Sequence, residues 1–337
     1  MTGAMVELEH VSKRFVKSLD LAEKIVNTLG GNLKEQVVHA VDKVDLAVND
    51  GEVVGLVGES GCGKSTLGRV IAGIHAASDG VVRFRGRDVA EMSSAEAKDW
   101  ALQVQMIFQD PMSSLNPRLR VREIIGEAAQ YHGLATADTL DDYVDEMMLR
   151  VGLDPSFKRR YPHQFSGGQR QRIGIARALA VRPSFLVCDE AIAALDVSIQ
   201  AQVINLFTRL REDLGLTYLF ISHDLAVVHH ISTKVGVMYL GRIVEWAASQ
   251  QLFGRPLHPY TRMLLDAVPD ISKTGTKRAQ VEGEVPSPIN PPSGCAFHPR
   301  CPFANERCRI ETPASILVED TTIACHAVQE ARLPGAG

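Results

Sequence analysis

The sequence GESGCGKST at residues 58–66 constrains the fold of this chain more than any other segment. It matches the phosphate-loop pattern G-x-x-x-x-G-K-[ST], and the apolar run at residues 51–58 leads into it like a buried strand. Glycines in such a loop let backbone N–H groups turn toward phosphate oxygens, and the next helix adds its positive N-terminus. The sequence therefore predicts a nucleotide site formed by Gly58, Ser60, Gly61, Gly63, Lys64, Ser65 and Thr66.

Within this loop, we expect Lys64 to reach the β and γ phosphates and Ser65 to place its hydroxyl on Mg²⁺. Asp189 and Glu190 end a later apolar run. Beside a magnesium phosphate, one carboxylate at a strand tip can organise the metal and its neighbour can polarise water. Taken alone, an acidic pair is equally typical of an ordinary strand end.

Short apolar runs alternate with helical patterns along the chain. The runs at residues 6–12, 51–58, 185–189, 218–222 and 234–240 are typical of buried strands, and residues 198–214 of a long helix. This alternation predicts a three-layer α/β core around a mainly parallel sheet. Residues 94–151 have helical spacing, and residues 18–37 resemble a helical insertion of unassigned role that Gly30 and Gly31 cap.

Composition limits the partners and the location of the chain. The 337 residues carry a net charge of -4, which argues against nucleic-acid binding through a basic face. Residues 1–15 lack the basic and apolar regions of a secretory signal, and no apolar run is long enough to cross a bilayer. We therefore expect a cytosolic chain that reaches a membrane only through a partner.

A change in composition suggests a domain boundary near residue 270. Residues 269–292 are rich in Pro, Thr, Lys and Ser, which is typical of a linker or an extended arm. We expect a nucleotide-binding domain at residues 1–269, with a helical subdomain at about residues 94–170. Residues 270–337 then form a linker and a small C-terminal extension.

Several further motifs resemble those of ATP-binding cassette (ABC) proteins. FSGGQRQR at residues 165–172 resembles the family signature, FQDP at 108–111 its glutamine loop, ALD at 194–196 its D-loop and ISHD at 221–224 its switch histidine. The resemblance covers nearly the whole chain and keeps the family order. It implies an α/β phosphate-loop NTPase (RecA-like) core with antiparallel β and α-helical subdomains.

The resemblance also implies roles for individual residues. Glu190 would be the general base, and Asp189 and Gln109 would organise Mg²⁺. His223 would contact the γ phosphate. Phe15 would stack on adenine, although a lone Phe is equally typical of a core or surface position. In this family two domains meet head to tail, so the signature of one closes over ATP bound by the other. The residues that would contribute across this interface are Ser166, Gly167, Gly168, Gln169 and Asp196.

The segment after Glu190 departs from the family pattern. Pro, Thr and Ser usually precede the D-loop, whereas this chain has Ala191, Ile192 and Ala193. None of the three changes removes the base or a ligand. We therefore expect retained ATP turnover, at a rate that the altered loop can lower.

Longer motifs resemble one branch of the family, the ATPase subunits of bacterial dipeptide and oligopeptide importers. They are IFQDPMSSLNP at 107–117, YPHQFSGGQR at 161–170, LDVSIQAQ at 195–202 and LHPYT at 257–261. The resemblance implies a heterodimer with a second ABC ATPase, two transmembrane permeases, an external substrate-binding lipoprotein, and a peripheral place on the cytoplasmic face of the inner membrane. Residues 126–152 and the glutamine loop would form the groove for the permeases.

Other functions stay open at this point. Nickel and oligosaccharide importers share these ATPase motifs, because the ATPase does not touch the cargo. A soluble cassette ATPase of DNA repair or translation usually has a coiled-coil insert or two cassettes, and an exporter usually carries its own membrane domain. A binding module with dead catalysis is disfavoured by intact Lys64, Asp189, Glu190 and His223.

Four of the six cysteines, namely Cys295, Cys301, Cys308 and Cys325, gather near the C-terminus without a C-x2-C pair. In a cytosolic chain, cysteines are more typical of metal ligands, reactive thiols or core residues than of disulfides. The surrounding GCAFHPRCPFA at residues 294–304 resembles the C-terminal extension of peptide-importer ATPases, which in some members holds a [4Fe–4S] cluster. Four thiolates suit that cluster, and a zinc site or no metal remains an alternative.

Overall fold

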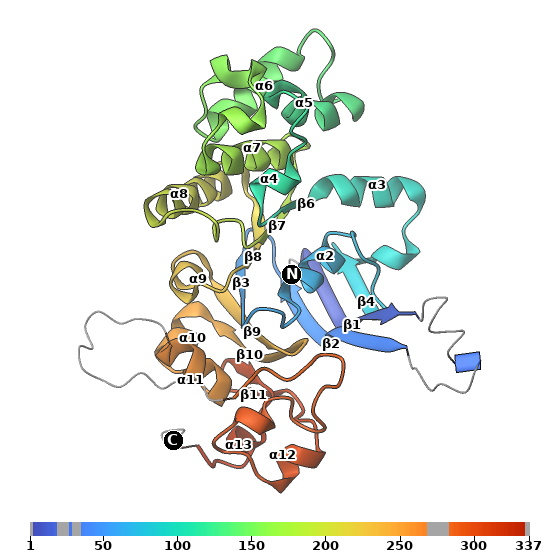
Figure 1. The fold of residues 1–337 in the computed structure, drawn as a ribbon, viewed down its shortest axis with the longest axis vertical. Coiled ribbons are helices and arrows are strands. Elements are labelled where there is room, and N and C mark those ends of the chain that lie inside the picture. Colours follow the sequence, from blue (N-terminus) through green and yellow to red (C-terminus); the bar gives the residue numbers. More distant parts are fainter. Residues whose placement is uncertain (1–2, 19–26, 29–34, 268–282, 334–337) are drawn as a thin grey trace.

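The computed structural model describes residues 3–18, 27–28, 35–267 and 283–333 (Figure 1). Their strands form two sheets. The main sheet has 8 strands, in the spatial order β11 (Ile316–Val318), β12 (Thr321–Ile323), β10 (Arg242–Ala248), β9 (Lys234–Tyr239), β3 (Val53–Val57), β8 (Thr217–Ile221), β7 (Phe185–Asp189) and β6 (Val104–Ile107).

The centre of the main sheet is parallel, as the sequence predicts. Strands β9, β3, β8, β7 and β6 all run in one direction. Every residue of β3, β7 and β8 is buried, which explains why these segments read as continuous apolar runs. Because parallel strands end at one edge, the phosphate loop after β3, Asp189 in β7 and Ser222 after β8 come together there.

The second sheet is antiparallel and has 4 strands, in the order β2 (Gln36–Val48), β1 (Val6–Lys17), β4 (Asp79–Phe84) and β5 (Arg87–Asp88). Helix α2 (Lys64–Ile71) packs against β1 and β2 of this sheet and against β7 and β8 of the main sheet. The helix that follows the phosphate loop is thus held between the two sheets (Figure 1).

The helical insertion expected at residues 18–37 lies mostly outside the described residues. Of the part that the structure describes, Asn27 and Thr28 are helical, whereas Gln36 and Val37 already belong to β2. Val37 pairs with Val16 of β1, so this end of the segment is a strand and not a helix.

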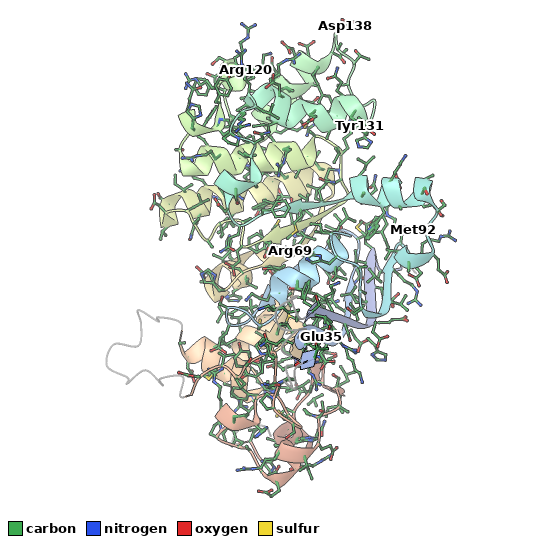
Figure 2. All side chains as sticks on the ribbon, turned by 45° about the vertical axis from the view of Figure 1, so that its right-hand side comes forward. Glu35, Arg69, Met92, Arg120, Tyr131 and Asp138 are labelled. Atoms are coloured by element: carbon green, nitrogen blue, oxygen red, sulfur yellow. The ribbon has the colours of Figure 1, made fainter. Side chains whose placement is uncertain are left out.

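Several helices form a helical part at one end of the molecule (Figure 1). That part holds α4 (Pro111–Ser114), α5 (Val121–Tyr131), α6 (Leu140–Arg150) and α7 (Gly167–Leu179), with the 3₁₀ turns Pro155–Arg159 and Pro162–Gln164. Helix α8 (Val197–Leu214) packs against α7. Figure 2 shows Arg120, Tyr131 and Asp138 at the outer end of this part, far from the sheets.

One segment of the predicted helical region is not helical. Residues Val104–Ile107 form β6, which pairs with β7 at the edge of the main sheet, and α3 (Ser94–Gln103) precedes it. The run VQMI is short and mostly apolar, so its periodicity alone does not separate a strand from a helix. Tertiary pairing with β7 decides the outcome.

The C-terminal segment continues the main sheet. Strand β12 pairs with β10 through Glu245 and Trp246, and β11 pairs with β12. The boundary expected near residue 270 lies outside the described residues. Elsewhere in the described residues lie the helices α9 (Leu225–Ile231), α10 (Ser249–Gly254), α11 (Pro259–Asp266), α12 (Glu306–Ile310) and α13 (His326–Gln329). Two 3₁₀ turns lie at Val89–Glu91, before α3, and at His298–Arg300, in the C-terminal segment. Within the described residues, no helix has the length and apolar character that a membrane span needs.

Candidate nucleotide site

Two glycines of the phosphate loop have backbone geometry that other residues rarely adopt. Gly58 has φ 151° and Gly63 has φ 107°. A Cβ at Gly58 would lie 2.2 Å from the carbonyl oxygen of Met238, and a Cβ at Gly63 would lie 2.0 Å from that of Ala40. Neighbouring backbone therefore fixes the shape of the loop, while Ser60 and Gly61 between them are exposed.

Lys64 lies at the start of α2 with its side chain turned back into the loop. The residue is only 4% exposed, and its Nζ donates to the carbonyl oxygens of Gly58 at 2.8 Å and Glu59 at 3.0 Å. Ser65 and Thr66 follow in the first turn of α2. The ammonium group is thereby held within the backbone of the loop, where a lysine can reach a phosphate that the loop N–H groups receive.

The hydroxyl of Ser65 meets the carboxylate of Asp189. Ser65 Oγ donates to Asp189 Oδ1 at 2.6 Å, across the edge of the sheet. Asp189 is 3% exposed, and burial raises the pKa of its carboxyl above the ordinary value. A hydroxyl and a carboxylate in contact are oxygen ligands of the kind Mg²⁺ prefers, so these residues fit the metal that accompanies a nucleotide.

Gln109 and His223 converge on Glu190. Gln109 Nε2 donates to Glu190 Oε2 at 2.8 Å, and His223 Nδ1 lies 3.5 Å from the same oxygen. Glu190 has φ 46°, and its backbone N–H donates to the carbonyl of Ile221 at 3.0 Å. A left-handed backbone is uncommon for a residue other than glycine and is often found at active sites.

Two of the three residues that depart from the family pattern are buried in the core. Ala191 and Ile192 are each 2% exposed and belong to the main hydrophobic core. The carbonyl oxygen of Ile192 accepts from Leu195 N at 3.1 Å and from Gln200 Nε2 at 3.1 Å. The apolar side chains therefore anchor this loop in the core, beside Glu190.

The signature lies at the N-terminus of α7, in the helical part. Ser166 caps the helix and forms a reciprocal pair with Gln169, and both Ser166 and Gly167 are exposed. Gly168 packs against Ile199 of α8, so a Cβ would meet that side chain at 2.5 Å. Asp196 precedes α8 and is exposed. Figure 1 shows α7 well separated from α2, so one chain does not bring its signature to its own phosphate loop.

Phe15 stands near the end of β1 and is 38% exposed. Its ring contacts His75 edge-on, with a centroid distance of 5.4 Å, and Lys13 Nζ lies 5.2 Å from the ring centroid. An exposed aromatic face next to a cation is suited to stacking on a base.

The four C-terminal cysteines are free thiols in one neighbourhood. Burial raises the pKa of Cys295 to about 11 and of Cys301 to about 12, and repulsion from the other thiols adds to both rises. Backbone N–H groups that follow Cys295, Cys301 and Cys325 hydrogen-bond to the sulfurs. In the described part of the chain, no group of three or more His, Cys, Asp or Glu side chains is arranged to hold a metal ion. The thiols thus interact without the close packing that a single ion requires.

Two histidines near these thiols have other partners. His326 is 1% exposed, with Nε2 2.9 Å from the carbonyl oxygen of Glu311 and Nδ1 3.2 Å from Gln329 Oε1. His298 Nδ1 lies 3.0 Å from the carbonyl oxygen of Cys295. The two remaining cysteines are buried, Cys188 completely, as its apolar neighbours predict.

The sequence did not indicate two residues that contact the phosphate loop. Tyr260 and Arg300 both bind Glu59, the second residue of the loop. Tyr260 belongs to the motif LHPYT and Arg300 directly precedes Cys301, but no local pattern links either to residue 59. The sequence did hold one signal, the carboxylate of Glu59 inside a loop whose pattern is typical of phosphate binding. A carboxylate in such a place needs a positively charged partner.

The mainly parallel sheet, the phosphate loop and the carboxylates beside it define a phosphate-loop nucleoside triphosphatase. Comparison with known families agrees. The family model "ABC transporter" matches residues 41–193, and the model "Oligopeptide/dipeptide transporter, C-terminal region" matches residues 244–308.

Related proteins cover most of the chain. The oligopeptide transport ATP-binding protein AppF of Bacillus subtilis is 50% identical over 294 residues, which are 86% of this chain and 89% of AppF. OppF of Salmonella typhimurium, also named an oligopeptide transport ATP-binding protein, is 51% identical over 82% of this chain and 84% of its own length. A dimeric ATP-binding cassette bound to ADP and Pi has a TM-score of 0.61 at 25% identity, covering 73% of this chain and 99% of that one.

The chain belongs to the ABC transporter family, as one of its ATP-hydrolysing subunits. The fold expected from the resemblance is confirmed.

Proposed function

We propose that this chain hydrolyses ATP to power the import of di- or oligopeptides across the cytoplasmic membrane through partner permeases. The observation that carries the proposal is the identity of about half of all aligned residues with AppF and OppF, over most of each chain. The C-terminal match to a region named for oligopeptide and dipeptide transporters supports the same branch of the family.

The roles of the site residues form part of this proposal. MgATP binds with its phosphates in the loop at residues 58–66, where Lys64 contacts the β and γ phosphates. Ser65 and Asp189 hold Mg²⁺, supported by their 2.6 Å contact, with Gln109 contributing from the neighbouring loop. Phe15 stacks on the adenine ring.

Glu190 is the general base in this account. Its carboxylate, oriented by Gln109 and close to His223, polarises the water that attacks the γ phosphate. His223 then contacts the γ phosphate. Magnesium would supply charge neutralisation at the phosphates when bound.

The ATP site is completed by a second cassette, arranged head to tail. The N-terminus of α7 carries a partial positive charge from the helix dipole, which is suited to a γ phosphate. This end of the helix is formed by Ser166, Gly167, Gly168 and Gln169. Asp196 lies at the same exposed side. The second cassette is a different ATPase chain, so that the pair is a heterodimer.

Docking to two permeases places the chain on the cytoplasmic face of the inner membrane. The helical part offers exposed apolar side chains, Tyr131 at 84% and Leu149 at 64% exposed, which support a protein-binding role. Figure 2 labels Tyr131 on this part. With the glutamine loop, residues 126–152 receive the permease segments. A substrate-binding lipoprotein outside the membrane delivers the peptide. In this proposal, the nucleotide-binding domain at residues 1–269 binds ATP, and its helical subdomain at about residues 94–170 docks to the permeases.

The extension at residues 270–337 carries a metal site in our proposal, formed by Cys295, Cys301, Cys308 and Cys325. Four thiols that interact, with backbone N–H groups on the sulfurs, suit a [4Fe–4S] cluster. A single zinc ion would need thiolates packed directly around one atom, with Zn–S bonds of about 2.3 Å. A cluster places iron and sulfide between the thiolates, so the four sulfurs need not surround a single atom. An iron and acid-labile sulfide content of about four each per chain, measured after anaerobic purification, would support the cluster. Stoichiometric zinc contradicts it.

The experiment that tests the transport assignment is purification of the tagged chain from detergent-solubilised membranes. We expect two multi-spanning permeases, a second cassette ATPase and a peptide-binding lipoprotein in constant ratio. Recovery only from the soluble fraction, with ribosomal or nucleic-acid partners, would overturn the proposal.

A further inference from the structure

Glu59, inside the phosphate loop, forms a two-pronged ion pair with the C-terminal extension. Arg300 Nη1 donates to Glu59 Oε2 at 2.7 Å, and Nη2 donates to Oε1 at 2.9 Å. The Arg300 side chain is 2% exposed and the Glu59 side chain 22% exposed. Bidentate pairs of this kind are among the stronger polar contacts in proteins, and burial protects this one from screening by salt.

Further contacts hold the same loop residue. The backbone N–H of Glu59 donates to the hydroxyl of Tyr260 at 2.9 Å, and Arg300 Nη1 lies 3.4 Å from the hydroxyl of Tyr239. The rings of Tyr239, Tyr260 and Phe297 pack on one another, with centroid distances of 4.7, 5.3 and 5.4 Å. Because the carbonyl oxygen of Glu59 accepts from Lys64 Nζ, this support reaches the lysine of the nucleotide site.

The position of Arg300 depends on a turn bounded by two of the cysteines. Arg300 ends the 3₁₀ turn His298–Arg300, between Cys295 and Cys301. The N–H of His298 donates to the carbonyl of Cys295 at 2.9 Å, and the N–H of Cys295 donates to the carbonyl of Cys308 at 2.8 Å. Whatever constrains these thiols therefore also constrains the guanidinium group on Glu59.

We propose that Arg300 is a positioning residue, through which the cysteine-bearing turn at residues 295–301 sets the affinity of the phosphate loop for MgATP. Arg300 neutralises a carboxylate that stands in the loop that receives a triphosphate, and it holds that loop in shape. Without Arg300, Glu59 repels the phosphates and the loop loses part of its support. The inference rests on the proposed nucleotide site.

The first test is calorimetric titration of the full chain with MgATP. We expect Arg300→Met to weaken binding about tenfold, within the usual range for coupled sites. The double variant Glu59→Gln with Arg300→Met recovers part of the lost affinity, because it removes the repelling charge but does not restore the support of the loop. Arg307→Gln is the matched control, since Arg307 lies in the same extension but pairs with Glu311 and Glu330. Wild-type affinity in Arg300→Met, or a double variant as weak as Arg300→Met, would overturn the inference.

Hydrogen exchange gives a second measurement. If Arg300 only stabilised the fold, MgATP would not change amide exchange in the turn at residues 295–301. Coupling is reciprocal, so MgATP should slow amide exchange in the turn at residues 295–301 of the wild-type chain. The double variant, which binds MgATP without the ion pair, should show no such slowing. Equal protection in both proteins, or none in the wild type, contradicts the inference. A wild-type chain that binds no MgATP refutes the proposed function instead.

Discussion

His258 offers a quantitative test of the packing behind the phosphate loop. The residue is 1% exposed, and its Nδ1 accepts from the backbone N–H of Tyr260 at 3.0 Å. Its own backbone N–H donates to Glu245 Oε2 at 2.9 Å. Burial lowers the pKa of the imidazole to about 3, so the ring is neutral in the folded protein.

This pKa makes the free energy of unfolding depend on pH in a definite direction. An exposed histidine in the unfolded chain has a pKa of about 6.5. Between the two pKa values only the unfolded state binds the proton, so acidification favours unfolding. The stabilisation of the folded state by neutral, buried His258 is fully present above about pH 6.5. It is lost progressively as the pH falls below that value. From about pH 7.5 to about pH 5, the loss due to His258 amounts to about 2 kcal/mol.

The assay is urea unfolding at both pH values for the wild-type chain and His258→Asn. Asparagine keeps a hydrogen-bond acceptor at the start of α11 but does not titrate. Glu245, whose pKa burial raises, is present in both proteins, so its effect largely cancels. We expect the wild type to lose about 2 kcal/mol more than the variant on acidification. Equal losses would refute the neutral, buried assignment of His258.

Three further predictions concern the nucleotide and cysteine sites. Glu190→Gln should slow phosphate release about a hundredfold or more in the presence of the partner ATPase, with MgATP binding kept; turnover near that of the wild type would contradict its role as base. Gly63→Ala should abolish MgATP binding in calorimetry, because its Cβ would lie 2.0 Å from a backbone oxygen, whereas Gly174→Ala has no atom within 4 Å and should bind normally. Removing iron with a chelator should lower the melting temperature by about 3 °C or more, and an unchanged melting curve would count against a cluster at the cysteines.

The parallel core was predictable because its signals are local. The strands before the phosphate loop and before Glu190 are continuous apolar runs, and both faces of these strands are buried. The contact of Ser65 with Asp189 follows from this topology, since both stand where parallel strands end. Charge and residue type at a strand end were sufficient to place these two side chains together.

Features that depend on distant pairing were not predictable in the same way. Residues Val104–Ile107 look alike as helix or strand, and only pairing with β7 decides between them. Strand β12 has three residues and joins the main sheet by pairing with β10. The sequence therefore suggests a separate C-terminal extension, whereas strand pairing makes this segment part of the main sheet. The pair of Glu59 and Arg300 joins segments 241 residues apart, and no periodicity carries that information.

The central claim is tested most directly by peptide uptake into proteoliposomes that contain the complete complex, with ATP on the side of this chain. The account predicts uptake of a labelled oligopeptide that requires ATP, stops with Lys64→Ala, and is lost with Glu190→Gln although ATP still binds. Uptake that is unchanged in Glu190→Gln, or a complex that moves nickel or oligosaccharides and no peptide, would contradict it.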